Sequence, residues 1–282
     1  MWFSVGGYAA GMPSGRHRSR DEASYRTRRV QDVEYHTSRT GFGDASLVAY
    51  RFPCRVAKKT TPDFVLIHGI GVSARSYGPT AVALANHGDV HLLDLAGYGR
   101  SPRPDRDLGI ADHAALVARY LDERKLDHPV VVGHSMGTQV AAQLCADFPG
   151  LSDHLVLIGP VVVPDARTLL KLSGLLLRDG LREPPSVTVL AIHDYLFRAG
   201  VPYLAQQLPH LLGADLEAVA GRVAARTLVL CGRDDPIVPV EWAIQLTSRF
   251  RHGWFATVPG PHASMFAAPE LVAGLLTDHA RR

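Results

Sequence analysis

Cysteine is scarce in this chain of 282 residues, which contains only Cys54, Cys145 and Cys231. An odd number of cysteines without a C-x-x-C pair fits neither a disulfide framework nor a thiolate zinc site. The 14 histidines are scattered, without the spacing of a metal-binding motif such as H-E-x-x-H. The sequence therefore predicts no metal site and a reducing cytoplasm as the location.

Long apolar runs are also missing. No run reaches the roughly 18 residues of a membrane-spanning helix, because Lys171, Ser173 and Gly174 interrupt the stretch from Leu169 to Leu177. The N-terminus lacks the cationic region that precedes the apolar part of a signal peptide. We therefore expect a soluble, cytoplasmic protein without a membrane span, of unknown oligomeric state.

The net charge of the chain is small, and the excess of basic over acidic residues lies at the N-terminus. The 30 Lys and Arg residues and the 27 Asp and Glu residues give +3, whereas residues 1–29 alone hold six arginines and two acids. We predict that residues 1–29 form a flexible, arginine-rich tail. The remainder has no basic stripe for nucleic acid, so we expect a small-molecule substrate. With 46% hydrophobic residues, the chain can bury a substantial core, which excludes overall disorder.

From Val30 onward, short apolar runs alternate with helical segments of ten or more residues. This alternation predicts a mostly parallel sheet with helices on both faces. Continuous apolar character is typical of strands covered on both sides, and the candidates are Phe64–His68, Val90–Leu95, Val130–His134, Leu155–Ile158, Thr227–Cys231 and Phe255–Val258. Two earlier runs, Val30–His36 and Ser46–Phe52, predict an antiparallel hairpin around Thr40–Asp44.

The alternation stops between Ile158 and Thr227, where a Leu-rich segment contains no convincing strand. This predicts an inserted helical cap over residues 161–225, on a core domain of residues 30–160 and 226–282. The leucines of the cap either pack it onto the core or line a pocket beneath it. Its charged residues are spread along the sequence rather than clustered, so we expect that pocket to be mainly apolar.

The strongest motif is Gly133-His134-Ser135-Met136-Gly137, which follows a predicted strand and opens a helix through Cys145. G-x-S-x-G between a strand and a helix is typical of a nucleophile elbow. The turn is so tight that only glycine fits beside the neighbouring elements, and the serine is held in strained geometry with its hydroxyl exposed. The helix N-terminus favours developing negative charge. Ser135 is therefore the candidate nucleophile.

A serine nucleophile needs a base, and the base needs an orienting carboxylate. Asp234 and Asp235 follow one predicted strand, and His262 follows the last. These residues lie beyond the carboxyl ends of strands, where open α/β sheets collect their sites, in the order Ser, Asp, His expected with this elbow. We expect His262 to act as the base with a pKa within about one unit of 6.5. Either aspartate could orient it.

An oxyanion hole requires two N–H donors that converge on the developing charge. The backbone N–H of Met136, the residue after the nucleophile, supplies one of them. The second is expected from the loop His68-Gly69-Ile70-Gly71, where glycines let the backbone approach a ligand. Ile70 is the first choice for this donor, and Gly71 is the second.

Together these motifs resemble the α/β-hydrolase superfamily over about residues 30 to 280. The matching stretches follow the family order: Val65–Gly69, Asp94–Ser101, Gly133–Gly137, Gly232–Pro239 and Pro259–His262. The resemblance implies an eight-stranded, mostly parallel sheet flanked by helices, with a helical cap after the sixth strand. The family pattern G-x-x-D-x-x-x-P fits Gly232, Asp235 and Pro239, and so implies Asp235 as the orienting acid.

The resemblance implies a serine hydrolase that cleaves carboxylic esters of small to medium apolar acyl groups through an acyl-enzyme, without a metal or another cofactor. Serine at the elbow separates the chain from the dehalogenase and epoxide-hydrolase branches, which have aspartate there. Open alternatives are hydrolysis of a carbon–carbon bond in a diketone or dienoate, hydrolysis of a thioester or lactone, acyl transfer, or ligand binding without catalysis. A dienoate substrate would need an inward-facing arginine such as Arg167, Arg178 or Arg198.

Overall fold

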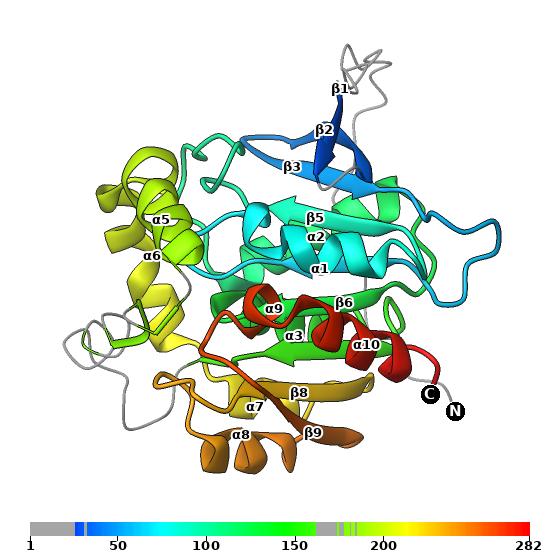
Figure 1. Cartoon of the computed structure of the whole chain (residues 1–282). Coiled ribbons are helices and arrows are strands. Elements are labelled where there is room, and N and C mark those ends of the chain that lie inside the picture. The colour runs from blue at the N-terminus through cyan, green and yellow to red at the C-terminus, as the bar shows by residue number, and fades with distance from the viewer. Residues whose placement is uncertain (1–25, 31–32, 162–173, 175–177, 181, 184) are drawn as a thin grey trace, which may run out of the picture.

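The computed structural model describes residues 26–282 except 31–32, 162–173, 175–177, 181 and 184. Within this part of the chain, the strands form one nine-stranded sheet in the order β1-β2-β3-β5-β4-β6-β7-β8-β9 (Figure 1). Strands β4 to β9 are parallel to one another, whereas β1, β2 and β3 are antiparallel to their neighbours. The strands are β1 (Arg26–Val30), β2 (Val33–Phe42), β3 (Ala45–Phe52), β4 (Phe64–Ile67), β5 (Val90–Asp94), β6 (Val130–His134), β7 (His154–Ile158), β8 (Arg226–Gly232) and β9 (Gly253–Val258).

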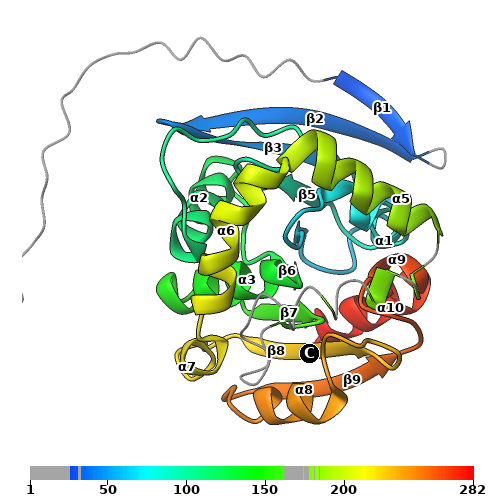
Figure 2. The same ribbon diagram turned by 90° about the vertical axis from the view of Figure 1, so that its left-hand side faces the viewer.

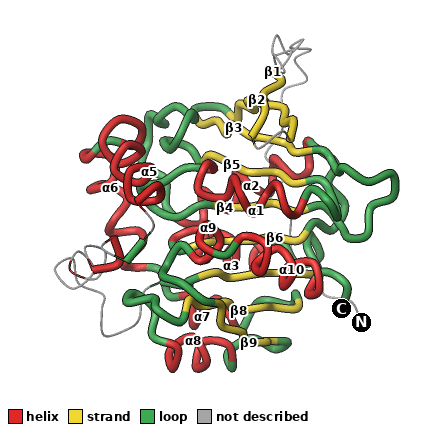
Figure 3. Tube along the Cα trace, in the orientation of Figure 1, coloured by secondary structure: helices red, strands yellow, loops and turns green. Residues whose placement is uncertain are grey.

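Helices cover both faces of the sheet (Figure 3). On one face lie α2 (Ile110–Glu123), α3 (Met136–Asp147), α7 (Leu216–Ala220) and α8 (Val240–Thr247), and on the other η1 (Ala74–Tyr77), α1 (Gly78–Leu84), α9 (Ser264–Ala267) and α10 (Pro269–His279). Successive residues of a strand point to opposite faces. In β4, Val65 and Ile67 therefore pack into one core, and Phe64 and Leu66 pack into the other. Burial on both faces explains why the central strands are apolar throughout, and the mostly parallel sheet is confirmed.

Between β7 and β8 the described residues contain no strand, and their helices include α5 (Pro185–His193), the π-helical turn η3 (Asp194–Ala199), α6 (Val201–Gly213) and α7. Helices α5 and α6 lie at the carboxyl ends of the parallel strands, at the edge that faces the viewer in Figure 2. Helix α7 instead packs against α3. The leucines between residues 169 and 177 lie outside the described residues. Of the helices that the structure describes, none combines the length and the apolar character that a membrane span needs.

The N-terminal segment differs from the prediction. Residues 26–29, assigned to a flexible tail, belong to β1, which pairs with β2 from Arg26 opposite Thr37 to Val30 opposite Val33. This edge strand is the ninth, one more than predicted. The predicted turn around Thr40–Asp44 is shorter, because β2 continues to Phe42 and β3 begins at Ala45. Residues 1–25 of the predicted tail lie outside the described residues.

Helix α3 begins in direct contact with strand β4. A Cβ atom on Gly137 would lie 2.3 Å from the carbonyl oxygen of Ile67 and 2.6 Å from that of His68. Both oxygens belong to the backbone of a buried segment, so neither can move aside cheaply. By contrast, a Cβ atom on Gly274, which is exposed in α10, would have no other atom within 4 Å.

We expect Gly137→Ala to lower the free energy of unfolding by at least about 2 kcal/mol, because the added methyl group overpacks the junction of α3 and β4. Gly274→Ala is the matched control, and it should raise the free energy of unfolding by about 0.5–1 kcal/mol, because alanine favours a helix over glycine. Urea unfolding followed by circular dichroism measures both changes. A Gly137→Ala variant as stable as the wild type would contradict the contact.

Candidate active site

Ser135 lies at the turn between β6 and α3 with φ 54° and ψ −123°. Residues other than glycine rarely adopt a positive φ, so the surrounding structure must hold this conformation. It does so partly by close packing, because a Cβ atom on Gly133 would lie 2.2 Å from the carbonyl oxygen of Gly137. In addition, the Ser135 N–H donates to the carbonyl oxygen of Ile158 in the neighbouring strand at 3.0 Å. The serine is thus fixed between a strand and a helix, as an elbow requires.

The structure brings Asp235, and not Asp234, against His262. Nδ1 of His262 lies 2.8 Å from Oδ2 of Asp235, and the two side chains are 6% and 0% exposed. The other carboxylate oxygen of Asp235 accepts two backbone N–H groups of the following turn, at 2.8 and 3.1 Å. Asp234 is exposed, and its backbone carbonyl accepts a hydrogen bond from Arg182. Because a carboxylate only accepts, Nδ1 carries a proton and donates it to Asp235.

The second ring nitrogen of His262, Nε2, is buried and has no hydrogen-bond partner within the described part of the chain. In a neutral imidazole protonated at Nδ1, Nε2 carries the lone pair. The ring centroid of His262 lies 4.7 Å from that of His134, the residue before Ser135. His262 therefore lies beside the elbow with a nitrogen able to accept a proton.

Three further side chains, none of them predicted from the sequence to have this role, hold the backbone around His262. His134 Nε2 donates to the His262 carbonyl oxygen at 3.1 Å. The Asp179 carboxylate accepts the His262 N–H at 3.1 Å, and the Glu183 carboxylate accepts the Ala263 N–H at 2.6 Å. We expected the charged residues of segment 161–225 to be spread out, but Asp179 and Glu183 lie together, against adjacent residues of the His262 loop. In the sequence, this pair is indicated only by its spacing. Glu183 lies four positions after Asp179, which places both side chains on one face of a helical turn.

These carboxylates change the acid–base properties of His262. Burial lowers the pKa of His262, but the charges of Asp235, Asp179 and Glu183 outweigh this effect and raise it to about 9. The pKa is thus higher than the value near 6.5 expected from the sequence. Burial raises the pKa of Asp179, and it raises the pKa of Glu183 to about 7. Placing two more carboxylates beside the His–Asp pair favours the charged imidazolium.

The loop after β4 passes directly beside Ser135. A Cβ atom on Gly69 would lie 2.8 Å from Cβ and 3.3 Å from Oγ of Ser135. The buried imidazole of His68 fixes this loop, because its Nε2 accepts the N–H of Leu95 at 3.1 Å and its Nδ1 lies 2.7 Å from the Gly69 carbonyl oxygen. Nδ1 therefore carries the proton that it donates to that carbonyl.

The two predicted oxyanion-hole donors lie on the segments that meet at Ser135. Met136 is the first residue of α3, so its N–H has no acceptor within the helix. Ile70 follows Gly69 in the loop and is half-buried. Their placement is compatible with N–H groups that converge near the serine, and their role in stabilising an oxyanion belongs to the proposal below.

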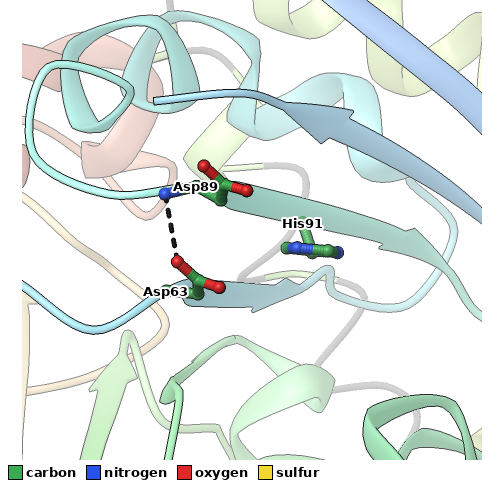
Figure 4. A group of neighbouring side chains, drawn as sticks. All are labelled: Asp63, Asp89 and His91. Atoms are coloured by element: carbon green, nitrogen blue, oxygen red, sulfur yellow. Dashed lines mark hydrogen bonds between the residues drawn. The ribbon is translucent and has the colours of Figure 1, made fainter. Parts of the chain in front are cut away.

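Within the described residues, one group of possible metal ligands lies close together. It lies at the amino ends of the central strands β4 and β5, away from Ser135. Ligand atoms of Asp63, Asp89 and His91 lie within 4.8 Å of one another (Figure 4). The two acids directly precede β4 and β5, and the Asp89 N–H donates to the Asp63 carboxylate at 3.3 Å. Arg51 lies 2.6 Å from the Asp89 carboxylate, and Lys59 lies 2.6 Å from that of Asp63. Because cations already pair with both carboxylates, we interpret the group as ion pairing between strand ends.

The chain is similar to proteins of known fold. The family model for the alpha/beta hydrolase fold matches residues 62–178. An uncharacterised protein of Mycobacterium tuberculosis (strain ATCC 25618 / H37Rv) is 33% identical over 127 residues, which is 45% of this chain and 37% of the relative. The chain therefore matches little more than a third of that relative's length.

Two further proteins match over most of their length. A Yersinia enterocolitica protein, provisionally named a carbamate hydrolase, is 28% identical over 238 residues, which is 76% of this chain and 86% of that protein. The crystal structure of an enol-lactonase from Burkholderia xenovorans superimposes with a TM-score of 0.74 at 18% identity, over 86% of this chain and 100% of that one. This likeness shows that the two chains share a fold.

The carboxylates around His262 generate a prediction about pH dependence. Only the neutral imidazole accepts a proton, so kcat/KM of a reaction in which His262 is the base should rise with pH as His262 deprotonates, with a midpoint above 6.5 and toward 9. Glu183→Gln keeps an acceptor for the Ala263 N–H but removes a charge that raises the pKa of His262. The midpoint should therefore fall by about one pH unit.

The control for this measurement is Glu123→Gln, which removes an exposed charge at the end of α2 and should leave the midpoint unchanged. The pH profile of kcat/KM for each variant gives the comparison. An equal midpoint in Glu183→Gln and the wild type would show that Glu183 does not act on the charge of His262.

Proposed function

Because the chain belongs to the α/β-hydrolase superfamily, we propose that it is a serine hydrolase that cleaves carboxylic esters of small to medium apolar acyl groups. Ser135 is the nucleophile, His262 the general base and acid, and Asp235 the residue that orients His262. The observation that carries this proposal is the buried hydrogen bond between His262 and Asp235 beside the strained turn at Ser135. A buried His–carboxylate pair next to a strained serine suits proton transfer from the serine hydroxyl.

The reaction proceeds in two halves. In the first, Ser135 Oγ attacks the ester carbonyl while His262 Nε2 accepts the serine proton, and the N–H groups of Ile70 and Met136 stabilise the oxyanion. The intermediate then collapses to an acyl-enzyme as His262 returns the proton to the leaving alcohol. In the second half, a water molecule gives a proton to His262 and attacks the acyl carbon. The second tetrahedral intermediate then collapses as His262 returns this proton to Ser135 Oγ, which releases the carboxylic acid and restores the serine hydroxyl. Each step uses side chains or backbone groups of this chain.

The surroundings of the site support an apolar acyl group. Ile70 and Tyr195 pack against the hydrophobic cluster that also contains Met136 and Val161, and a Cβ atom on Gly71 would lie 2.1 Å from the ring of Tyr195. These side chains come from the elbow, the neighbouring loop and the cap. We propose that the cap, residues 161–225, supplies part of the acyl pocket above the core domain.

The charges near His262 disfavour the carbon–carbon hydrolase alternative, whose dienoate substrate carries a carboxylate. Asp179 and Glu183 both contact the His262 loop and would repel a second anion. Of the arginines that this alternative requires, Arg178 is exposed and Arg198 lies 3.2 Å from Asp194, whereas Arg167 lies outside the described residues. The carbamate hydrolase name of the Yersinia enterocolitica relative is compatible with attack at an ester-like carbonyl. The three free cysteines support the cytoplasmic location that we propose.

The two adjacent acids provide a matched pair of variants. We expect Asp235→Asn to lower kcat/KM by a factor on the order of 10⁴, because the amide no longer holds the productive tautomer of His262. Asp234→Asn should change it less than about threefold, because the Asp234 side chain is exposed. Steady-state kinetics with one ester measures both. The reverse order of effects would assign the orienting role to Asp234.

The substrate preference is tested with a series of 4-nitrophenyl esters. From acetate to butyrate to hexanoate, kcat/KM should rise by up to about fourfold per buried methylene until the pocket is full. Mono-4-nitrophenyl succinate matches butyrate in length but adds a carboxylate, and it should react at least about tenfold more slowly than butyrate. A flat or falling series, together with faster cleavage of the succinate ester or of an anionic diketone, would favour the carbon–carbon hydrolase.

A further inference from the structure

A cavity of about 590 Å³ lies between the N-terminal strands, the beginning of α1 and the turn η3. None of the residues proposed to act in catalysis lines it. Figure 2 shows the setting, with β2 and β3 arching past α5 and α1. The volume is within the range of pockets that bind small organic molecules, about 300–1,000 Å³.

The sheet side of this cavity is aromatic. Tyr35, Tyr50 and Phe52 line it, and the rings of Tyr35 and Phe52 stack at 5.1 Å with an interplanar angle of 22°. The Tyr50 hydroxyl donates to Asp94 at 2.7 Å, so this hydroxyl is already engaged. Burial, followed by the charge of Asp94, raises the pKa of Tyr50, which keeps the hydroxyl protonated. This wall therefore offers flat apolar surface.

The rim of the cavity is cationic. Its lining contains the four arginines Arg28, Arg75, Arg100 and Arg198, together with His193. Beside this lining lies the carboxylate of Asp194, which is 1% exposed and accepts a hydrogen bond from Ser73 at 2.5 Å. Three of the basic side chains share this one carboxylate, at 3.2 Å for Arg198, 3.2 Å for His193 and 3.6 Å for Arg75.

The other two arginines of the lining, Arg28 and Arg100, are not paired with Asp194. Among the described residues, neither Arg28 nor Arg100 has a carboxylate within 4.0 Å of its guanidinium group, although the Arg100 backbone N–H donates to Asp94. The buried Nε of Arg198 also has no hydrogen-bond acceptor there, because its approach to Asp194 lacks hydrogen-bonding geometry. Four arginines beside Asp194 and the enclosed Asp94 leave an excess of positive charge at the cavity.

We propose that this cavity binds an organic anion with a planar aromatic body and a carboxylate or phosphate group. The flat body would cover Tyr35, Tyr50 and Phe52 and bury apolar surface on both sides. The acidic group would face Arg28 and Arg100, whose planar guanidinium groups match carboxylate and phosphate oxygens in a bidentate arrangement. The site is separate from the proposed acyl pocket, and it does not depend on the proposed hydrolysis.

Isothermal titration calorimetry with naphthalene-2-carboxylate and 2-naphthyl phosphate tests this proposal, with naphthalene-2-methanol as the uncharged analogue. At least one anion should bind the full-length protein at a single site, at least about tenfold more tightly than the alcohol. The better of the two anions identifies the preferred acidic group. The double variant Arg28→Gln/Arg100→Gln changes two side chains that have no carboxylate partner in the described part of the chain, and it should weaken that binding at least about tenfold.

The matched control is Arg251→Gln, which removes an exposed arginine that does not line the cavity and should leave the affinity unchanged. Circular dichroism and thermal unfolding establish that each variant is folded. The proposal is overturned if neither anion gives saturable binding, if the alcohol binds equally well, or if the double variant binds like the control. Binding of an anion in the catalytic site instead would be insensitive to Arg28 and Arg100 and would give the last of these results.

Discussion

The backbone conformation of Ser135 is the constraint on which the candidate site depends. A positive φ at a non-glycine residue costs about 1–3 kcal/mol, so it persists only where the neighbouring structure forces it. Here α3 begins so close to both β6 and β4 that neither Gly133 nor Gly137 has room for a side chain. The same close approach starts α3 at Met136 and brings Gly69 against the serine. Ser135 and the segments that carry Met136 and Ile70 are thus placed by one packing arrangement.

The candidate site also needs a histidine that is held beside the Ser135 turn. Four side chains hold His262 in this position. Asp235 binds the His262 ring, whereas His134, Asp179 and Glu183 bind the backbone on either side of it. Two of these residues come from the segment between β7 and β8, so this segment contributes directly to holding the His262 loop. This support has an electrostatic consequence, because the added carboxylates raise the pKa of the base. Positioning and basicity of His262 are therefore set by the same contacts.

Much of this arrangement could be predicted from local sequence. The core strands were predicted within two residues of their bounds, because strands buried on both faces are continuously apolar. The β1 strand was missed because its sequence, Arg-Thr-Arg-Arg-Val, has no apolar pattern and gains its order from pairing with β2. Asp179 and Glu183 were missed because they contact residues about 80 positions away, and no local pattern reports such a contact. The clustering of arginines from β1, η1, the loop after β5 and η3 is likewise a product of the fold alone.

The most direct test of the account is to map the residue that a fluorophosphonate labels. Intact mass spectrometry of the labelled protein should show one adduct per chain, and tandem mass spectrometry of its peptides should place that adduct on Ser135. The Ser135→Ala variant, folded by circular dichroism, should take up no label and lose ester turnover by a factor of about 10⁴ to 10⁶. A label on another residue, or undiminished turnover by a pure preparation of Ser135→Ala, would contradict the assignment of Ser135 as the nucleophile.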